Sequence, residues 1–195
     1  MAMRRSGLLW MAGAAAILLS ACMTIGGVKD STGKNSRMAT FVIGVEPKDA
    51  WLAILPGEIR EGRINFSDVS RAVYYGPSKD GYVIGQVASD KPLGIMQVRL
   101  VSKPGGFIGT NYVACGGGKT LTFVPKIGSV AYLGNVRYEA GADELDVAYV
   151  DRFDEAKAFL QSHYPELGSL VERSEREVLP AIDACGEIVA YPFPR

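Results

Sequence analysis

The stretch YVIGQVASDKPLGIMQVRLV, residues 82–101, sets the character of this chain. Two runs rich in valine and isoleucine, residues 82–88 and 95–101, flank the link Ser89-Asp90-Lys91-Pro92-Leu93-Gly94. Runs of β-branched residues bounded by turn-forming residues are typical of strands. The stretch therefore predicts two strands that are joined by a turn-rich link.

Similar runs extend on both sides of this stretch. KTLTFV, residues 119–124, alternates polar and apolar side chains as a half-buried strand does. Strands are predicted at residues 39–45, 51–55, 71–75, 82–88, 95–101, 107–114, 120–124, 129–138 and 145–150. Turn signals every eight to twelve residues favour an antiparallel sandwich or barrel. No helix-length segment separates the runs, which argues against a parallel α/β sheet. We therefore expect residues 38–150 to form a mainly β, antiparallel β-sandwich.

The pattern becomes helical at Asp151. This residue suits an N-cap, and Asp154 and Glu155 favour the positive first turn of a helix. Its apolar face would carry Phe153, Ala156, Phe159, Leu160 and Tyr164. Pro165 would end this helix and open a second one, which stops at Pro180 and has a weaker stripe of Leu167, Leu170, Val171, Val178 and Leu179. We expect residues 151–195 to pack on the same domain, with the tail 185–195 running over the sandwich or adding an edge strand.

The run FVPKIGSVAYLGN, residues 123–135, has the form of a strand, a Pro/Gly turn and then small-x-Tyr-x-Gly-Asn. It precedes a second pair of strands and the helix that ends in Tyr164-Pro165. Over residues 80–170 this order resembles uncharacterised bacterial lipoproteins with a prealbumin-like, immunoglobulin-like or carboxypeptidase-regulatory-like β-sandwich. The resemblance implies a fold and a compartment, and it implies no catalytic residue.

The N-terminus reads as an export signal. Arg4 and Arg5 precede the apolar run GLLWMAGAAAILL, residues 7–19. As a helix this run is about 20 Å long, too short for a hydrocarbon core of about 30 Å. The sequence Leu19-Ser20-Ala21-Cys22 then resembles the lipobox of bacterial lipoproteins. This resemblance implies that residues 1–21 are a signal peptide and that Cys22 becomes the lipidated first residue of the mature protein.

Two or more acyl chains hold a protein on a membrane stably, so the lipid on Cys22 would be the membrane partner. Met23 follows Cys22, where an aspartate would retain a lipoprotein in the inner membrane under enterobacteria-like sorting. We therefore expect an anchor in the outer membrane, facing the periplasm. Residues 22–37, rich in Gly, Ser, Thr and Asn, are predicted to be a flexible tether with a root-mean-square reach of about 20 Å.

Charge argues against nucleic acid as a partner. The chain has 21 basic and 21 acidic residues. Removal of residues 1–21 deletes only Arg4 and Arg5 among the charged residues, which leaves 19 basic against 21 acidic and a net charge of −2. A chain without a basic excess has no field that attracts phosphates. The composition, 48% apolar and 22% charged, is that of a globular domain.

Cys115 and Cys185 remain once Cys22 is lipidated, in a compartment that permits disulfides. We predict that they form a disulfide, which would close about 70 residues and add roughly 4 kcal/mol on the chain-entropy model. The alternative is two inert cysteines. A redox role is disfavoured because the chain has no C-x-x-C pair.

Other motifs are weaker. Gly116-Gly117-Gly118-Lys119-Thr120 lacks the first glycine of a phosphate-binding loop, since position 113 is valine, and a strand rather than a helix is predicted after it. It reads as a hairpin loop. His163, the only histidine, reads as a capping or surface residue at a helix end. We predict no metal and no cofactor, because too few His and Cys side chains are free for a zinc site.

An acidic stretch and nine tyrosines complete the candidate residues. The acids Asp143, Glu144, Asp146, Asp151, Asp154 and Glu155 do not have the spacing of a calcium loop and read as solvated carboxylates. The tyrosines are Tyr74, Tyr75, Tyr82, Tyr112, Tyr132, Tyr138, Tyr149, Tyr164 and Tyr191. Neighbours in a strand point to opposite faces, so one of Tyr74 and Tyr75 is expected outside the core. Trp51, beside apolar residues, is expected in the core.

Three functions compete at this point. The first is a non-enzymatic envelope lipoprotein that packs against or recruits an envelope protein. The second is a glycan or cell-wall binding module, which requires a line of exposed tyrosines on one sheet face. The third is a periplasmic hydrolase, which requires one pocket that gathers Asp146, Asp151 and His163.

Overall fold

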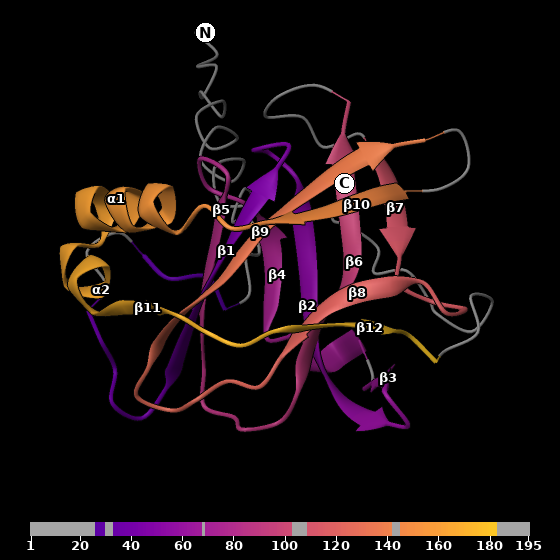
Figure 1. Cartoon of the computed structure of the whole chain (residues 1–195), viewed down its shortest axis with the longest axis horizontal. Coiled ribbons are helices and arrows are strands. Elements are labelled where there is room, and N and C mark those ends of the chain that lie inside the picture. The colour runs from indigo at the N-terminus through magenta and orange to yellow at the C-terminus, as the bar shows by residue number, and fades with distance from the viewer. Residues whose placement is uncertain (1–25, 30–32, 68, 103–108, 142–144, 183–195) are drawn as a thin grey trace, which may run out of the picture.

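The computed structural model describes residues 26–29, 33–67, 69–102, 109–141 and 145–182. Strands dominate it, and they form two sheets with two short helices near the C-terminal end (Figure 1). The prediction of a mainly β fold with a C-terminal helical segment is therefore confirmed. Cys22, Asp143, Glu144, Cys185 and Tyr191 lie outside the described residues, as do the predicted signal peptide and the tail 183–195.

The first sheet has five strands in the order β10-β9-β1-β5, and β11 pairs with β9 beside that path. The bounds are β1 Ala39–Glu46, β5 Tyr82–Val87, β9 Val130–Ala140, β10 Leu145–Val150 and β11 Val171–Arg173. β5 and β10 are thus the two opposite edge strands of this sheet.

The second sheet has seven strands in the order β12-β8-β6-β2-β3, with β4 also paired to β2 and β7 to β6. The bounds are β2 Trp51–Arg60, β3 Arg63–Phe66, β4 Tyr74–Pro77, β6 Leu93–Val101, β7 Gly109–Val113, β8 Lys119–Phe123 and β12 Glu177–Pro180. Every pairing in it is antiparallel, and the sheet curls like part of a barrel (Figure 1).

The prediction of an antiparallel sandwich is wrong at β9, which has two parallel partners. β1 runs parallel to β9 from Thr40 opposite Val130 to Glu46 opposite Arg137, and β11 is also parallel to β9. The chain between β1 and β9 forms the β5 strand and most of the other sheet. Parallel neighbours need a long connection, and here strands rather than a helix supply it. The lack of helical segments therefore did not exclude a parallel pair.

Most predicted strands are present, with shifted ends. β2 continues past Leu55 to Arg60 and forms a hairpin with β3, which the sequence did not indicate. The strand predicted at residues 71–75 is displaced: Val69–Arg71 is a short 3₁₀ helix, η1, and β4 begins at Tyr74. The predicted strand 107–114 is described only from Gly109 onward.

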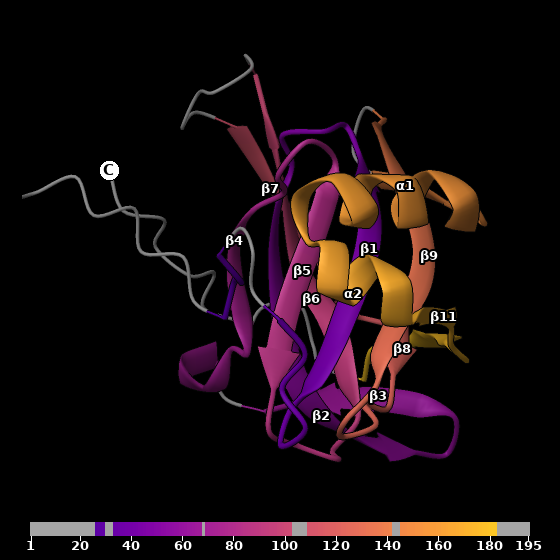
Figure 2. The ribbon, with the colours of Figure 1, turned by 90° about the vertical axis from the view of Figure 1, so that its left-hand side faces the viewer.

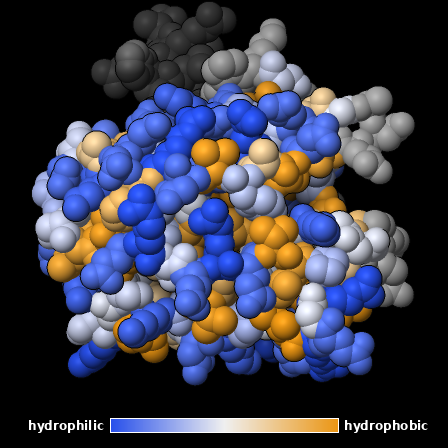
Figure 3. All heavy atoms as spheres, in the orientation of Figure 1, coloured by the Kyte–Doolittle hydropathy of each residue, from blue (hydrophilic) through white to orange (hydrophobic). Residues whose placement is uncertain are grey.

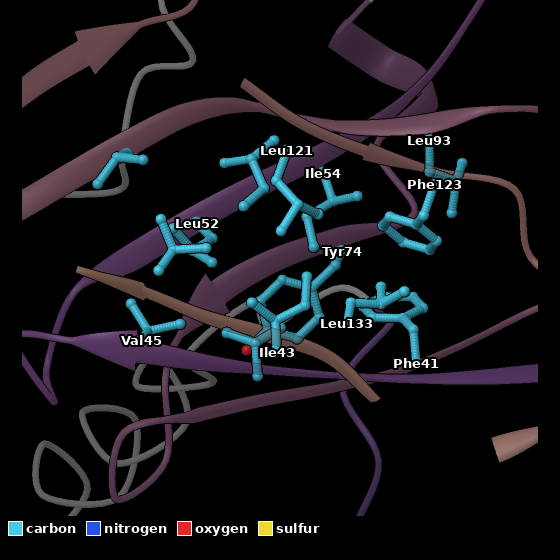
Figure 4. Close-up of a cluster of buried hydrophobic side chains, with 14 of the residues drawn as sticks. Phe41, Ile43, Val45, Leu52, Ile54, Tyr74, Leu93, Leu121, Phe123 and Leu133 are labelled. Atoms are coloured by element: carbon cyan, nitrogen blue, oxygen red, sulfur yellow. The ribbon is translucent and has the colours of Figure 1, made fainter. Parts of the chain in front are cut away.

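The main core lies between the two sheets (Figure 4). Phe41 is 1% exposed and meets Phe123 of the other sheet with ring centroids 5.4 Å apart. It also lies 6.4 Å from the ring of Tyr74. Gly85 makes room for this ring, because a Cβ at position 85 would lie 2.2 Å from Phe41 Cζ. One aromatic side chain thus joins both sheets.

The helices cover the outer face of the five-stranded sheet (Figure 2). α1 spans Phe153–His163 and α2 spans Pro165–Leu170. Ala156, Leu160 and Tyr164 of the predicted apolar face are buried, and Phe153 and Phe159 are half-buried. Arg152, not Asp151, is the N-cap residue, although Asp151 Oδ1 accepts a hydrogen bond from Phe153 N at 3.0 Å. The Asp151 carboxylate therefore accepts a hydrogen bond from the first turn of the helix, although Asp151 lies one residue before the N-cap.

The second predicted helix is too long. It ends at Leu170, and the chain continues as β11 and β12 rather than reaching Pro180 as a helix. Glu172–Glu177 contains no apolar residue that would mark a helical period. The backbone instead pairs with β9 and then with β8. Pairing with strands of both sheets satisfies the backbone N–H and C=O groups as well as a helix would. The weak apolar stripe of the predicted helix could not distinguish a helix from these two strands.

The expectation that one of Tyr74 and Tyr75 lies outside the core is wrong. Tyr74 is 3% exposed in the main core, and Tyr75 is 2% exposed in a separate cluster with Trp51 and Met96. The two rings do point to opposite faces, as neighbours in a strand must. The outer face of the seven-stranded sheet carries an apolar cluster of its own, so both rings are buried.

Two findings concern the N-terminal part of the chain and the search for membrane-spanning helices. Residues 26–28, assigned from the sequence to a flexible tether, lie along the free edge of β5. Within the described ranges no helix has the length and hydropathy to cross a bilayer.

Candidate functional site

A cavity of about 460 Å³ opens between the two sheets, on the side where β10 faces β7 and β8. β9 and β10 supply Tyr138, Leu145, Val147 and Tyr149. The other sheet supplies Ile95, Met96, Val98, Tyr112, Val113, Ala114, Cys115, Gly116, Gly118, Lys119 and Thr120. The size is that of small-molecule sites, which typically enclose about 300–1,000 Å³, and the walls combine apolar and polar surface in about equal parts.

Three phenols give this cavity its polar groups. Tyr138 is buried, and Tyr112 and Tyr149 are half-buried. No described residue forms a hydrogen bond with the hydroxyl of any of the three. A buried phenol usually has a hydrogen-bond partner. The cavity therefore presents donor and acceptor groups whose hydrogen-bonding capacity the described protein leaves unused.

The phenols of Tyr138 and Tyr149 are also neutral over a wide pH range. Burial raises the pKa of Tyr138 well above its ordinary value, and the nearby Tyr149 adds to this effect. Burial raises the pKa of Tyr149 to about 12, although Arg176 works in the opposite direction. At neutral pH both hydroxyls can therefore donate as well as accept a hydrogen bond.

We expect Tyr149 to titrate near pH 12 in the folded protein. Its ordinary pKa is 10.0, so the folded state favours the neutral phenol. The resulting stabilisation is fully present below pH 10 and is lost as the pH rises through 12. Ultraviolet absorbance of tyrosinate measures this step, and Tyr149→Phe should remove it while leaving the amplitude near pH 10 unchanged. Loss of amplitude near pH 10 in the variant would contradict the assignment.

One cation stands at the wall of the cavity. Lys119 is exposed, and among the described residues that line the cavity it is the only one with a charged side chain. The neighbouring Thr120 is already engaged, because its hydroxyl donates to the carbonyl of Ile95 at 2.5 Å. A cavity of mixed polar and apolar lining, with phenols and a lysine in its wall, suits a ligand with an apolar body and an anionic or hydrogen-bond accepting end.

A second hollow, of about 500 Å³, has a different character. It lies where the chain crosses from β11 to β12, between the two sheets on another side. Ile59 and Val124 are exposed there, at 41% and 56%, and the face that carries β8 and β12 shows apolar atoms between hydrophilic ones (Figure 3). Its wall contains three acids, Glu172, Glu175 and Glu177, and three bases, Lys126, Arg173 and Arg176. This balance selects no ligand charge, so the first cavity is the better candidate.

The residues proposed for a hydrolase are not brought together. Asp146 and Asp151 are exposed, and Asp151 pairs with Arg173 at 2.9 Å, which lowers the pKa of its carboxyl. His163 lies at the far end of α1, a helix about 16 Å long. Its ring stacks on Phe159, and its Nδ1 lies 3.1 Å from the Phe159 carbonyl oxygen. Neither hollow is lined by any of these three side chains.

The exposed row of tyrosines required by the glycan-platform hypothesis is not formed. Five of the nine tyrosines, Tyr74, Tyr75, Tyr132, Tyr138 and Tyr164, are buried. Tyr132 has a structural role, because its hydroxyl donates to Asn135 Oδ1 at 2.6 Å and accepts from Arg152 N at 2.8 Å. The half-buried Tyr82 stacks on Phe159 of α1. The two remaining described tyrosines, Tyr112 and Tyr149, line the cavity instead of an open face.

The glycine-rich segment after Cys115 is a turn between β7 and β8, but it is not the predicted hairpin loop, because in the described structure both strands pair antiparallel with β6 and not with each other. Gly118 N donates to the Cys115 carbonyl at 2.8 Å, and β8 follows directly. Cys115 itself is half-buried in the cavity wall. Because Cys185 lies outside the described residues, the disulfide between the two stays a prediction. Among the residues that the structure describes, no group of three His, Cys, Asp or Glu side chains could hold a metal ion.

Sequence reasoning did not find this cavity. Tyr112, Tyr138 and Tyr149 were recognised only as members of a long set of tyrosines, and they come from three strands in two sheets.

A comparison with models of protein families, with curated proteins and with solved structures found no match for the chain.

Proposed function

We propose that this chain is a lipid-anchored envelope lipoprotein whose sandwich is a non-enzymatic binding module for a small amphipathic molecule. The cavity lined by Tyr112, Tyr138 and Tyr149 is the observation that carries the proposal. The lipobox at Cys22 supports the anchor, and the separation of Asp146, Asp151 and His163 weakens the hydrolase alternative.

The chemistry of the walls defines the ligand class. Leu145, Val147 and Val98 offer apolar contact to a ring or an acyl chain. Lys119 offers a charge to a carboxylate or a similar anion at one side of the cavity. A fatty acid or an aromatic carboxylic acid has both features. A polar sugar without an apolar face would leave the apolar part of these walls without complementary contacts, so the cavity favours an amphipathic molecule over a glycan.

A fluorescent apolar amine, N-phenyl-1-naphthylamine, tests the cavity directly, because its emission rises in apolar surroundings. Val147→Phe adds bulk to the cavity wall, and we expect the affinity for the probe to fall by about tenfold or more. Ala148→Phe is the matched control. Ala148 is the next residue of β10, does not line the cavity and pairs with the exposed Arg137, so binding should persist.

Competition defines the ligand class further. A medium-chain fatty acid should displace the probe from the wild-type protein, and Lys119→Gln should weaken that competitor more than it weakens the neutral probe. Equal probe binding by the Val147 and Ala148 variants, or no saturable binding by the wild type, would overturn the proposal.

The finer features of the assignment rest on the sequence. A prealbumin-like or immunoglobulin-like topology, an outer-membrane location facing the periplasm and an envelope protein partner are expectations from the resemblance and from residues 19–23. The proposed role includes neither a cofactor nor nucleic acid.

A further inference from the structure

Residues 26–28 add a short extended segment to the edge of β5. Gly27 pairs antiparallel with Gly85. Val28 N donates to the Ile84 carbonyl at 3.3 Å, and Gln86 N donates to the Gly26 carbonyl at 3.4 Å. The side chain of Val28 packs against the apolar cluster between the sheet and the helices. Both backbone and side-chain contacts therefore hold this segment on the folded domain.

Gly26 fits where a larger residue would not. A Cβ at this position would lie 1.8 Å from the carbonyl oxygen of Val73, which directly precedes β4. Its φ of +73° also lies in the left-handed region that favours glycine. Gly26 thus passes between β5 of one sheet and the start of β4 of the other. In the sequence, the pair Gly26-Gly27 suggests flexibility. In the structure, it allows two backbone segments to lie close together.

We infer that the mature N-terminus docks on the domain and that lipid on Cys22 holds the β4–β5 side of the sandwich against the bilayer. This inference rests on the proposed lipidation. Only four residue steps separate Cys22 from Gly26, which span at most about 14 Å. A free segment reaching to residue 37 would have a root-mean-square reach of about 20 Å and would impose no orientation. The partner of the β4–β5 side is therefore a lipid surface.

Docking also places the cavity away from the bilayer. The cavity is lined by β10 and the far part of β9, whereas residues 26–28 lie outside β5. β10 and β5 are opposite sides of one sheet. Three strand spacings and one more to the docked segment amount to about 19 Å. The cavity therefore opens on the side that faces the aqueous phase, where a soluble or carried ligand arrives.

Energy transfer from Trp51 to a dansyl-labelled lipid headgroup measures this arrangement in vesicles of phosphatidylethanolamine and phosphatidylglycerol. Trp51 is the only tryptophan after residue 21. It lies three residues along β2 from Ile54, the partner of Tyr74, hence about 10 Å from the docking point. In the lipidated mature protein, which begins at Cys22, we expect efficient transfer, and Gly26→Ala should reduce it by about half because the anchor is released to its longer reach.

Gly62→Ala is the matched control. Gly62 has a similar φ, +71°, but nothing lies within 4 Å of the added Cβ, so the backbone strain is alike and the overlap is absent. Energy transfer should stay at the wild-type value in this variant. Hydrogen exchange of the Val28 and Gln86 amides should accelerate in Gly26→Ala and stay slow in Gly62→Ala, since both amides donate across the docked segment in the native structure.

A second variant keeps the proposal testable if Gly26→Ala folds poorly. Insertion of about 20 Gly and Ser residues after Met23 leaves the docked strand intact and lengthens only the link to the lipid, so energy transfer should fall. Unchanged transfer in both variants would overturn the docking inference. Cys22→Ala protein should not float with vesicles. If the wild type also failed to float, the proposed lipid anchor would be wrong, whereas slow exchange at Val28 and Gln86 would still support docking.

Discussion

Replacing Phe41 with alanine is expected to lower the free energy of unfolding by about 3–5 kcal/mol. The ring is 1% exposed and meets Tyr74 and Phe123 across the core, while its far edge fills the space over Gly85. Truncation removes this contact area and leaves a cavity that the two sheets cannot close without moving apart. Since domains are stable by about 5–15 kcal/mol in total, the variant should be only marginally folded.

Urea denaturation followed by Trp51 fluorescence measures this loss. The control is Ile59→Ala, in which an aliphatic side chain that is 41% exposed is shortened near the end of β2. Its effect should stay below about 1 kcal/mol, because little area is withdrawn from contact. A Phe41→Ala variant that unfolds at the same urea concentration as the Ile59 control would show that the contact between the sheets is not the main core.

The second large effect concerns Cys115. If it is bonded to Cys185, loss of the bond should lower the free energy of unfolding by roughly 4 kcal/mol, an upper figure from the entropy of a loop of about 70 residues. The described structure places Ala181 beside the turn that follows Cys115. Gly117 N donates to the Ala181 carbonyl at 2.9 Å, and Ala181 N donates to the Gly118 carbonyl at 3.0 Å. Cys185 follows Ala181 by four residues, at most about 14 Å of chain.

Thiol alkylation of the unfolded, unreduced mature protein followed by mass spectrometry counts the free cysteines, and none should be found. Urea midpoints with and without reductant then give the stabilisation. The double variant Cys115→Ser with Cys185→Ser is the control, because its midpoint should not respond to reductant. Two alkylated thiols in the untreated protein would favour the alternative of inert cysteines.

Local sequence patterns predicted the strands and the helix whose formation depends mainly on residues that are neighbours in the chain. The strands at β1, β5, β6, β8, β9 and β10 follow from runs of β-branched and aromatic residues between turn signals. The first helix and its buried positions, Ala156, Leu160 and Tyr164, follow from a 3.6-residue period that needs no partner to be recognised.

Sequence patterns failed where pairing with strands far away in the chain determines the local structure. Glu172–Glu177 has no strong local preference, and it leaves the helix because β9 and β8 offer it paired edges. The tether at residues 22–37 stays a prediction, and within it Gly27 pairs with the edge of β5 and Gly26 approaches the carbonyl of Val73, which composition did not indicate. In both cases the contact joins residues far apart in the chain, and single-sequence patterns carry no record of it.

The amino-acid sequence by itself determined a β-rich domain with a C-terminal helix, and its N-terminal residues carry the proposed anchor signal, because hydrophobic periodicity, turn residues and a short apolar run act locally. Only the tertiary structure decided that β1 and β9 run parallel and that both Tyr74 and Tyr75 are buried. It also brought Tyr112, Tyr138 and Tyr149 to one cavity. These outcomes depend on which strands become neighbours, and that choice is made by burial of apolar area over the whole domain rather than by any one segment.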